Sequence, residues 1–439
     1  MIISVIGCGY LGAVHAVAMA SLGHQVIGVD VDGEKVARLS AGRAPFFEPG
    51  LDEFLTQVMA TGRLTFSTDM AQIHPAEVHF VAVGTPQSAT GAADLQYVDA
   101  AVDAALPHVV AGSLFVGKST VPVGTADRLA TAISPSGARV AWNPEFLREG
   151  HAIQDTLRPD RIVYGVGTGD EESVRMLDAV YADALAHGVP RMVTDLRTAE
   201  LVKVAANAFL ATKISFINAM AEVAETVDAD VVALADAIGQ DARIGRRFLD
   251  AGVGFGGGCL PKDLRAFIAR SEELGSGEAT SFLREVDRIN SRRRQRVVDV
   301  LAEELGDLNG ARIAVLGIAF KPESDDVRDS PALEVVRRLV EAGAHVTATD
   351  PRAIASARRA HPELTVDYRE SAEETMRDAD AVVLLTEWVQ FRDLDPRAAR
   401  ALVRRALLVD GRNALDATVW ADAGWRVRGL GRAAVGPGR

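Results

Sequence analysis

The chain has 439 residues, more than a single hydrophobic core usually supports, so two or three domains are expected. Its 60 acidic residues outnumber its 47 basic ones, and the formal net charge of −13 argues against binding to nucleic acid or to anionic membrane surfaces. The two cysteines, Cys8 and Cys259, give neither a disulfide framework nor a zinc-binding spacing. No metal site is therefore expected, and a reducing, cytoplasmic compartment is favoured.

The first 195 residues predict a parallel sheet with helices on both faces. Short β-rich runs alternate with Ala-rich helical stretches such as residues 11 to 22 and 95 to 110. The first run starts directly after Met1, which leaves no room for a signal peptide. We assign residues 1–195 to one α/β domain, with expected strands "IISVIG", "QVIGVD", "VHFVAVGTP", "LFVGKSTV", "RVAWNPEF" and "RIVYGVG".

The turn after the first expected strand is rich in glycine. Gly7, Gly9 and Gly12 have the G-x-G-x-x-G spacing, which permits a tight turn, close approach of a pyrophosphate and packing of helix on strand. The next strand ends at Asp30, 18 residues beyond Gly12, where a carboxylate accepts hydrogen bonds from a ribose and repels a 2′-phosphate. NAD is therefore the predicted cofactor. The alternative for the glycine turn is a tight turn without a ligand. Cys8, within the motif, is expected to be a small packing residue, with a redox role as its alternative.

Two further strand ends point to the same edge of this sheet. "VAVGTP" and "KSTVPVGT" follow apolar runs with hydroxyl, glycine and proline residues. Thr85 and Thr120 are candidates to hydrogen-bond cofactor or substrate, although either could instead cap a helix.

Residues 196–300 carry helical patterns and no strand signal. The apolar region from 201 to 238 is interrupted by Lys203, Lys213 and Glu222, which argues against a membrane span. Lys203 and Asn207 are four residues apart and share one helix face. They form either part of a solvated face or a cation and an amide that converge on an oxyanion.

The stretch "GVGFGGGCLPKD" places Cys259 in a glycine-rich loop. The glycines allow the backbone to approach a ligand closely, and Pro261 favours the start of a helix just after the cysteine. A helix N-terminus with Lys262 nearby favours a thiolate. Cys259 is therefore either a nucleophile or a packing residue.

The strand and helix alternation resumes after "DLNG". Residues 308–425 predict a second α/β domain, with strands in "ARIAVLGIAF", "HVTATD", "DAVVLLTEW" and "ALLVDGRN", and residues 426–439 read as a frayed tail. Both α/β halves show a strand, a glycine turn, a helix and a strand ending in aspartate, Asp30 or Asp350. The expected fold is thus two doubly wound, Rossmann-like parallel sheets joined by a helical central domain, which we expect to mediate dimerisation or a higher homo-oligomer.

A thiolate beside an NAD site suggests that an aldehyde-level intermediate is held as a thiohemiacetal, oxidised to a thioester and hydrolysed to an acid. Several longer motifs add to this hypothesis: "GCGYLG", "PFFEPGL", "VGTP", "STVPVGT", "NPEFLREG", "KVAANAFLATKISFIN", "GFGGGCLPKD" and "FKPESDDVRDSP". In this order, over residues 1 to about 413, they resemble the UDP-glucose/GDP-mannose dehydrogenase family, and most closely its UDP-glucose 6-dehydrogenases. The resemblance implies a four-electron oxidation of a sugar C6 alcohol to a carboxylate, with two NAD reduced.

The resemblance also implies roles for individual residues. Cys259 would be the covalent nucleophile, Asp263 would orient or activate water, and Glu145 would do acid–base work in hydrolysis. Lys203 and Asn207 would contact substrate and stabilise the oxyanion, and Thr120 would be a further catalytic residue. The cofactor would be bound by Gly7, Gly9, Tyr10, Leu11, Gly12, Asp30, Lys35, Thr85, Thr120, Glu149, Lys262 and Arg328. The sugar nucleotide would be bound by Glu145, Phe146, Leu147, Arg148, Glu149, Lys203, Asn207, Arg243, Phe248, Leu249, Asp250, Ala251, Gly252, Gly256, Lys321 and Arg412. Arg412 is also a candidate to reach a neighbouring subunit.

Two features fall outside this pattern. Gly258 stands where many family members carry serine, which bears on sugar choice more than on chemistry. The run "RINSRRRQRVV", residues 288 to 298, is predicted to be a solvated helix face.

Competing hypotheses remain open. They are the same chemistry on GDP-mannose or a UDP-N-acetylhexosamine, a two-electron hydroxyacid dehydrogenase with a structural Cys259, and a non-enzymatic sensor of NAD or nucleotide sugar.

Overall fold

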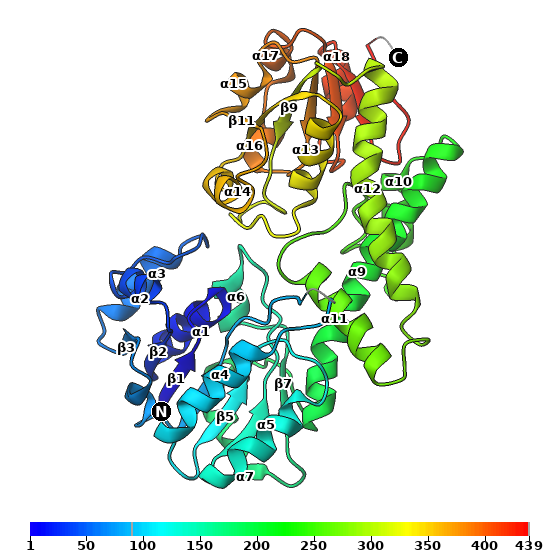
Figure 1. Ribbon diagram of the computed structural model, residues 1–439. Coiled ribbons are helices and arrows are strands. Elements are labelled where there is room, and N and C mark those ends of the chain that lie inside the picture. Colours follow the sequence, from blue (N-terminus) through cyan, green and yellow to red (C-terminus); the bar gives the residue numbers. More distant parts are fainter. Residues whose placement is uncertain (89–90, 438–439) are drawn as a thin grey trace. The chain divides into compact units, whose positions relative to one another are not determined.

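The computed structural model describes residues 1–88 and 91–437 and divides the chain into two compact units (Figure 1). Unit 1 comprises Met1–Ala206 and Arg265–Gly277. Unit 2 comprises Asn207–Leu264 and Glu278–Arg439. Each unit is built around its own sheet.

Unit 1 holds an eight-stranded sheet in the order β3-β2-β1-β4-β5-β6-β7-β8. All neighbours are parallel except β6 and β7, which pair antiparallel. The strands are β1 (Ile2–Ile6), β2 (Gln25–Val29), β3 (Leu64–Ser67), β4 (Val78–Val81), β5 (Leu114–Gly117), β6 (Arg139–Trp142), β7 (Ile162–Val166) and β8 (Arg191–Thr194). The sequence did not predict β3 and β8, because both are short and most of their residues are intermediate or exposed, which leaves little apolar pattern.

Helices cover both faces of this sheet, as the sequence predicted. Along β5, Leu114 and Val116 belong to one buried cluster while Phe115 belongs to another, so successive side chains enter cores on opposite faces. The α-helices are α1 (Tyr10–Ser21), α2 (Gly33–Ser40), α3 (Leu51–Met59), α4 (Gln96–Ala105), α5 (Thr125–Ile133), α6 (Ala152–Leu157), α7 (Glu171–Val180) and α8 (Ala182–Ala186). Short 3-10 turns lie at Met70–Ile73, Leu106–His108 and Ser134–Ser136.

The middle of the chain is helical. It forms α9 (Leu196–Thr226), α10 (Val231–Gly239), α11 (Leu260–Glu273) and α12 (Phe282–Leu305), and the structure describes no strand between β8 and β9. Among the described residues, α9 alone is long and apolar enough to cross a membrane by length and composition. Its polar side chains Lys203, Asn207 and Asn218 are buried and bonded to protein groups, as in the core helix of a folded domain.

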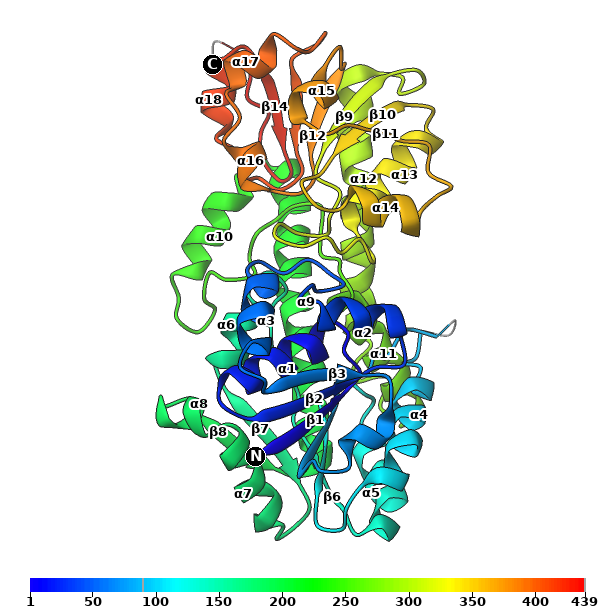
Figure 2. The same ribbon diagram turned by 90° about the vertical axis from the view of Figure 1, so that its left-hand side faces the viewer.

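Unit 2 holds a six-stranded parallel sheet in the order β11-β10-β9-β12-β13-β14 (Figure 2). Its strands are β9 (Arg312–Leu316), β10 (His345–Thr349), β11 (Asp367–Tyr368), β12 (Ala381–Leu384), β13 (Leu407–Asp410) and β14 (Arg426–Gly429). Its remaining helices are α13 (Pro331–Glu341), α14 (Ile354–Ala360), α15 (Ala372–Met376), α16 (Val389–Arg392), α17 (Pro396–Arg400) and α18 (Ala417–Asp422). The order repeats that of the first six strands of unit 1, which confirms the predicted echo between the two halves.

The predicted tail is corrected at its start. Residues 426–429 form the edge strand β14, paired with β13, and Val435 then pairs with Val427 in an isolated bridge. The Gly, Pro and Arg content of this segment gives no strand pattern, because β14 is short and is stabilised by its pairing with β13. Residues 438–439 of the predicted tail lie outside the described residues.

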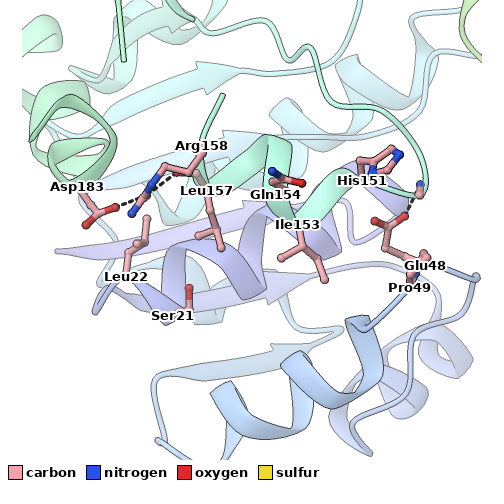
Figure 3. Close-up of a pocket in the computed structure, with 11 residues that line it drawn as sticks. Ser21, Leu22, Glu48, Pro49, His151, Ile153, Gln154, Leu157, Arg158 and Asp183 are labelled. Carbon is pink, nitrogen blue, oxygen red and sulfur yellow. Dashed lines mark hydrogen bonds and ion pairs between the residues drawn. The ribbon is translucent and has the colours of Figure 1, made fainter. Parts of the chain in front are cut away.

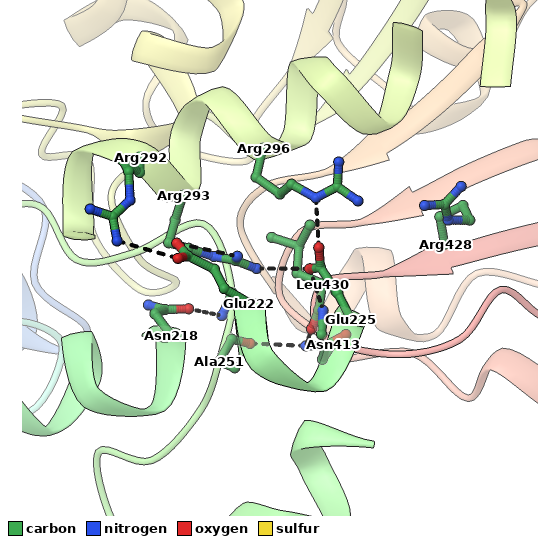
Figure 4. Close-up of polar contacts among 12 residues, drawn as sticks. Asn218, Glu222, Glu225, Ala251, Arg292, Arg293, Arg296, Asn413, Arg428 and Leu430 are labelled. Carbon is green, nitrogen blue, oxygen red and sulfur yellow. Dashed lines mark hydrogen bonds and ion pairs between the residues drawn. The ribbon is translucent and has the colours of Figure 1, made fainter. Parts of the chain in front are cut away.

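The predicted solvated face at residues 288 to 298 is also wrong in part. This stretch lies in α12, where the side chains of Asn290 and Arg293 are fully buried. Arg293 sits between two carboxylates of α9, 3.9 Å from Glu222 and 3.4 Å from Glu225 (Figure 4). The arginine run therefore packs against an acidic stretch of another helix, which a charge pattern read from one segment cannot reveal.

Candidate active site

The glycine turn after β1 has the geometry that its sequence predicted. Gly7 has a φ of +91°, and a Cβ at Gly12 would lie 1.8 Å from the carbonyl oxygen of Gly7, so neither position tolerates a side chain. Gly9 caps α1, whose first turn carries no acidic residue. Tyr10 and Leu11 begin this helix. The N-terminus of α1 thus presents backbone amides and a positive dipole end.

Asp30 lies directly after β2 and is held beside this turn. Its carboxylate accepts hydrogen bonds from the backbone amide of Cys8 at 2.7 Å and from the Lys35 ammonium at 2.8 Å. Cys8 itself is buried, and burial strongly raises the pKa of its thiol. The neutral thiol therefore suits the packing role.

These residues fit a bound NAD. A Cβ at Gly9 would meet no described atom within 4 Å, so the space in front of the helix N-terminus is open where a pyrophosphate would sit. The equivalent aspartate of unit 2 does not offer such a site. Asp350 accepts hydrogen bonds from the backbone amides of Ile318 and Ala319 and from the indole of Trp388, so its carboxylate already has three donors within unit 2.

Thr85 and Thr120, from the ends of β4 and β5, meet directly. The Thr85 hydroxyl donates to the carbonyl oxygen of Thr120 at 2.8 Å. The turn that follows Thr120 is held from two helices. Glu200 of α9 accepts the amides of Gly124 and Ala126 at 2.7 and 2.6 Å, and Arg270 of α11 donates to the carbonyl of Val123 at 2.9 Å.

Glu200 was missed by sequence reasoning, since a glutamate in a helix normally indicates a solvated position. Its side chain is buried, and burial raises its pKa to about 7, although the two backbone hydrogen bonds oppose the rise. The Glu200 carboxyl therefore titrates near neutral pH while it fixes the turn that carries Thr120.

The "NPEFLREG" motif forms the loop between β6 and α6. Glu145 accepts a hydrogen bond from the Lys203 ammonium of α9 at 3.0 Å, and the two side chains are only 12% and 7% exposed. Glu145 also accepts the backbone amide of Leu147 at 2.7 Å. The face of Phe146 lies against Arg161, 3.8 Å from the ring centre, and Lys203 is 5.6 Å from the same ring. The Glu145–Lys203 pair thus lies beside the contact between Arg161 and the ring of Phe146.

The far end of this loop is fixed by Glu48 of the "PFFEPGL" motif. The buried Glu48 carboxylate accepts the amides of Gly150 and Ala152, both at 2.7 Å, and bonds to the hydroxyl of Tyr10. Sequence reasoning named the motif but not this residue. Through Glu48, the first turn of the nucleotide-binding helix is tied to the end of the loop that carries Glu145.

Within the same loop, Arg148 lies differently from its predicted neighbours. Its side chain is mostly exposed and makes an ion pair with Asp155 at 2.7 Å, and its backbone amide bonds to the same carboxylate. Glu149, next to it, is half-buried.

Cys259 is the N-cap of α11 and is exposed, as expected of a reactive thiol. The amide of Asp263 donates to the carbonyl of Cys259 at 2.9 Å and closes the first turn. Gly254 and Gly257 precede it with φ values of +99° and +84°. A Cβ at Gly258 would lie 2.3 Å from the Arg328 guanidinium carbon, so the absent serine leaves room for that side chain.

Asn207 and Asp263 are joined in unit 2. Asn207 donates from Nδ2 to Asp263 Oδ2 at 2.7 Å, and both are buried. The other carboxylate oxygen accepts a hydrogen bond from Lys262 at 2.7 Å. The predicted water-orienting acid is therefore fixed by two predicted site residues.

Three asparagines hold the backbone that leads to Cys259. Asn218 accepts the amide of Gly252 at 2.9 Å and Asn413 donates to the carbonyl of Ala251 at 3.0 Å (Figure 4). Asn290 bonds to both the amide and the carbonyl of Phe255, at 2.8 and 2.9 Å. Sequence reasoning missed all three, since asparagine in a helix or loop has no spacing signature.

The remaining residues of the "FLDAG" segment are placed unevenly. Leu249 is buried, Phe248 has a φ of +66°, and Asp250 is exposed and bonds to Arg246. Gly256 is buried, and a Cβ there would lie 2.3 Å from the carbonyl oxygen of Asp329.

The predicted cations of unit 2 have different surroundings. Arg243 is exposed and contacts Asp241 of its own loop, so the described residues do not bring it to the other candidates. Arg328 pairs with Asp326 at 2.6 Å, and the Lys321 ammonium lies 5.5 Å from the centre of the Phe320 ring.

Arg412 is bound within its own chain. Its guanidinium donates to the carbonyls of Leu385, Gly254 and Phe320 at 2.7, 3.1 and 3.0 Å. It therefore supports the glycine loop through Gly254. The sequence-based suggestion that Arg412 reaches a neighbouring subunit did not anticipate this contact.

A cavity of about 620 Å³ lies elsewhere in unit 1 (Figure 3). Its lining comes from the end of α1, from Glu48 and Pro49, and from α6, and it includes the ion pair of Arg158 with Asp183. None of the predicted site residues lines it. The described residues also contain no group of three or more His, Cys, Asp or Glu side chains that could hold a metal ion.

The doubly wound sheet, the glycine turn and the adjoining Asp30 define an NAD-dependent oxidoreductase. Three family models match the chain: the NAD binding domain of the UDP-glucose/GDP-mannose dehydrogenase family at residues 1–185, its central domain at 197–292 and its UDP binding domain at 314–417. The chain therefore belongs to the UDP-glucose/GDP-mannose dehydrogenase family.

Similar proteins align with this chain over nearly their full length. The chain is 40% identical to UDP-glucose 6-dehydrogenase YwqF of Bacillus subtilis, covering 100% of this chain and 99% of the relative. It is 42% identical to a UDP-glucose 6-dehydrogenase of Rhizobium meliloti, covering 98% and 100%. The structure of a UDP-glucose dehydrogenase from Pyrobaculum islandicum matches with a TM-score of 0.89 at 41% identity, over 98% of each chain.

Proposed function

We propose that this protein oxidises UDP-glucose to UDP-glucuronate with two molecules of NAD. The proposal is carried by identity of about 40% to UDP-glucose 6-dehydrogenases over essentially the whole chain. An exposed cysteine at a helix N-terminus supports it, because such a thiol can hold the intermediate between two oxidations. In this proposal residues 1–195 bind NAD, 196–300 form the central domain and 308–425 bind the UDP group.

The chemistry divides among the chain's own residues. After the C6 alcohol loses a proton and a hydride, the Cys259 thiolate adds to the aldehyde carbon and a C–S bond forms. Lys203 and Asn207 stabilise the negative charge on the oxygen. Loss of a second hydride gives a thioester, and NAD, when bound, supplies the hydride acceptor for each oxidation.

Hydrolysis completes the turnover. Asp263, held by Asn207 and Lys262, orients a water molecule. Glu145, paired with Lys203, takes a proton as that water attacks the thioester carbon. The C–S bond breaks, the thiolate of Cys259 is restored, and the carboxylate product leaves.

The test is NADH formation from a panel of sugar nucleotides. We expect UDP-glucose to yield two NADH per molecule, with UDP-glucuronate identified as product by mass spectrometry. No turnover of UDP-glucose would overturn the choice of sugar, and one NADH per sugar would overturn the four-electron chemistry.

The second candidate is the same oxidation of another nucleotide sugar. One observation favours keeping it in the panel: the structure of a UDP-D-ManNAc dehydrogenase from Pyrococcus horikoshii matches with a TM-score of 0.85 at 27% identity, over 98% of this chain and 99% of that one. GDP-mannose and the UDP-N-acetylhexosamines therefore belong in the same assay.

We also propose that the protein is a homodimer or a higher homo-oligomer formed through α9. An apolar stripe runs along this helix in unit 2, where Phe209, Phe216 and Val223 are exposed, and the exposed Val227 follows directly after its last residue, Thr226. The spacing of seven residues between Phe209, Phe216 and Val223 places them on one side of the helix, and such a patch favours a second copy of the chain as its cover. Light scattering of Phe209→Glu/Phe216→Glu should show a monomer. A monomeric wild type would overturn the proposal.

For location we propose the cytoplasm. Both cysteines are free thiols, and the proposed nucleophile needs reducing conditions. Cell fractionation with activity assays of each fraction tests this, and activity confined to an oxidising compartment would contradict it.

A further inference from the structure

Lys118, just after β5, is a buried cation that the proposed mechanism does not use. The sequence contains six lysines among its 47 basic residues. Four of them, Lys35, Lys203, Lys262 and Lys321, are candidate ligand or catalytic residues. Lys118 is only 7% exposed, which is unusual for an ammonium unless the fold requires it.

The partners of Lys118 are neutral. Its ammonium donates to Asn143 Oδ1 at 3.0 Å and to the Tyr181 hydroxyl at 3.3 Å. The Tyr181 hydroxyl donates to the same Asn143 oxygen at 2.5 Å. The rings of Phe80 and Tyr181 each lie 5.8 Å away. Among the described residues no carboxylate is within ion-pair distance of Lys118, so its charge is not neutralised by direct contact.

Asn143 is the first residue of the loop that carries Glu145, and it is held on every side. Its backbone amide donates to the carbonyl oxygen of Gly117, the residue directly before Lys118, at 2.8 Å. Its side-chain amide donates to Val163 at 2.9 Å. Asn143 thus fixes the start of this loop two residues before Glu145, and Lys118 and Tyr181 fix the side-chain oxygen of Asn143.

The charge of Lys118 also reaches the proposed acid–base pair. Burial lowers its pKa to about 8, Glu145 opposes this and Lys203 adds to it, so all three charges interact. The other titratable group nearby is His15 of α1, whose two ring nitrogens make no hydrogen bond and whose pKa burial holds well below its usual value. His15 is therefore neutral and adds no charge beside Lys118.

We propose that Lys118 is a positioning residue for the oxidation: with Tyr181 it holds Asn143, sets the place of Glu145, and supplies a buried positive charge behind the Glu145–Lys203 pair. This inference rests on the proposed function, because it assigns Lys118 to the same reaction. Lys118 is thereby added to the residues of the reaction, although it has no motif spacing and no assigned contact with a ligand.

Three variants separate placement from charge. Lys118→Met keeps a side chain of similar length and removes both the positive charge and the hydrogen bonds to Asn143 and Tyr181. Tyr181→Phe removes the hydroxyl that bonds to both Asn143 and Lys118 and keeps the charge of Lys118. Tyr164→Phe, the control, removes a neighbouring hydroxyl that bonds to neither Lys118 nor Asn143, its ring centre 6.1 Å from that of Tyr181.

We expect Lys118→Met to lower kcat by about tenfold or more and Tyr181→Phe by about threefold, as for lost hydrogen bonds in a preorganised site. The KM for NAD should stay within about twofold, since the glycine turn is untouched. Tyr164→Phe should resemble the wild type. Thermal melts of all variants check folding, and Tyr181→Phe keeps the test valid if Lys118→Met does not fold.

The pH profile of kcat distinguishes this role from a structural one. Burial lowers the pKa of Lys118 to about 8, so the wild-type kcat should fall as pH rises through 8, and Lys118→Met should lack this alkaline limb. Tyr181→Phe should leave the limb in place. Wild-type kcat and an unchanged alkaline limb in Lys118→Met would overturn the inference, whereas an inactive wild type would instead overturn the proposed function.

Discussion

Asn207 donates a hydrogen bond to Asp263 at 2.7 Å in a buried position, and so joins α9 to the first turn of α11. Asp263 in turn accepts a hydrogen bond from Lys262. A buried carboxylate with two such partners is fixed in direction. The pair therefore sets the geometry on which the proposed hydrolysis depends.

Asp263→Asn should lower kcat by a factor of about one hundred or more while the fold is kept. The amide can still bond to Asn207, but it carries no charge to orient the water or to balance Lys262. Steady-state NADH formation measures the effect. Asp299→Asn, which alters an exposed acceptor on α12, is the control, and equal rates for both variants would contradict the assigned role.

Cys259→Ala should abolish formation of the acid, with a loss of about a thousandfold or more, because no covalent intermediate can form. NAD binding should be unchanged, since Cys259 is not one of the predicted cofactor residues. Chromatography of the sugar products and calorimetry with NAD are the measurements. Near-normal acid production would defeat the covalent mechanism.

Glu48→Gln should weaken both the cofactor turn and the loop of Glu145. The buried carboxylate accepts two backbone amides, and in glutamine an NH₂ group must face one of them. We expect the unfolding free energy to fall by about 1–3 kcal/mol and the KM for NAD to rise. Tyr10→Phe removes only the hydroxyl contact, so a Tyr10→Phe effect as large as that of Glu48→Gln would contradict the importance of the two amides.

The sequence predicted those parts of the structure that depend on neighbouring residues. The turn at Gly7, Gly9 and Gly12 and the aspartate after β2 follow from local spacing, and they lie together as expected. The start of α11 directly behind Cys259 follows from Pro261 in the same way. Local backbone rules thus sufficed for these elements.

Buried charges could not be predicted in this way. Glu48 bonds to residues 102 and 104 positions further along the chain, and Lys118 to one 63 positions away. In the sequence each is a single charged residue whose usual location is the surface. Only the fold shows that each is buried with backbone or neutral partners. The arginines of α12 were also missed, because their carboxylate partners lie on another helix.

Glu200 gives a prediction for stability. Its pKa is raised to about 7, chiefly by burial, from an ordinary value of 4.5. The folded protein therefore binds the proton more tightly than the unfolded chain does. The stabilising contribution of the protonated carboxyl is fully present below about pH 4.5, and it is lost as pH rises through about 7.

Glu200→Gln removes this titration, so the stability of the wild type relative to this variant should fall between pH 5 and pH 7, by at most about 1.4 kcal/mol per pH unit. Urea unfolding at several pH values measures the difference, and Glu341→Gln, at an exposed position, supplies the baseline. A difference that is flat, or that grows with pH, would contradict the burial of an ionisable carboxyl at the turn of Thr120. Because Glu200 bonds to Gly124 and Ala126 of that turn, the same variant should also raise the KM for NAD.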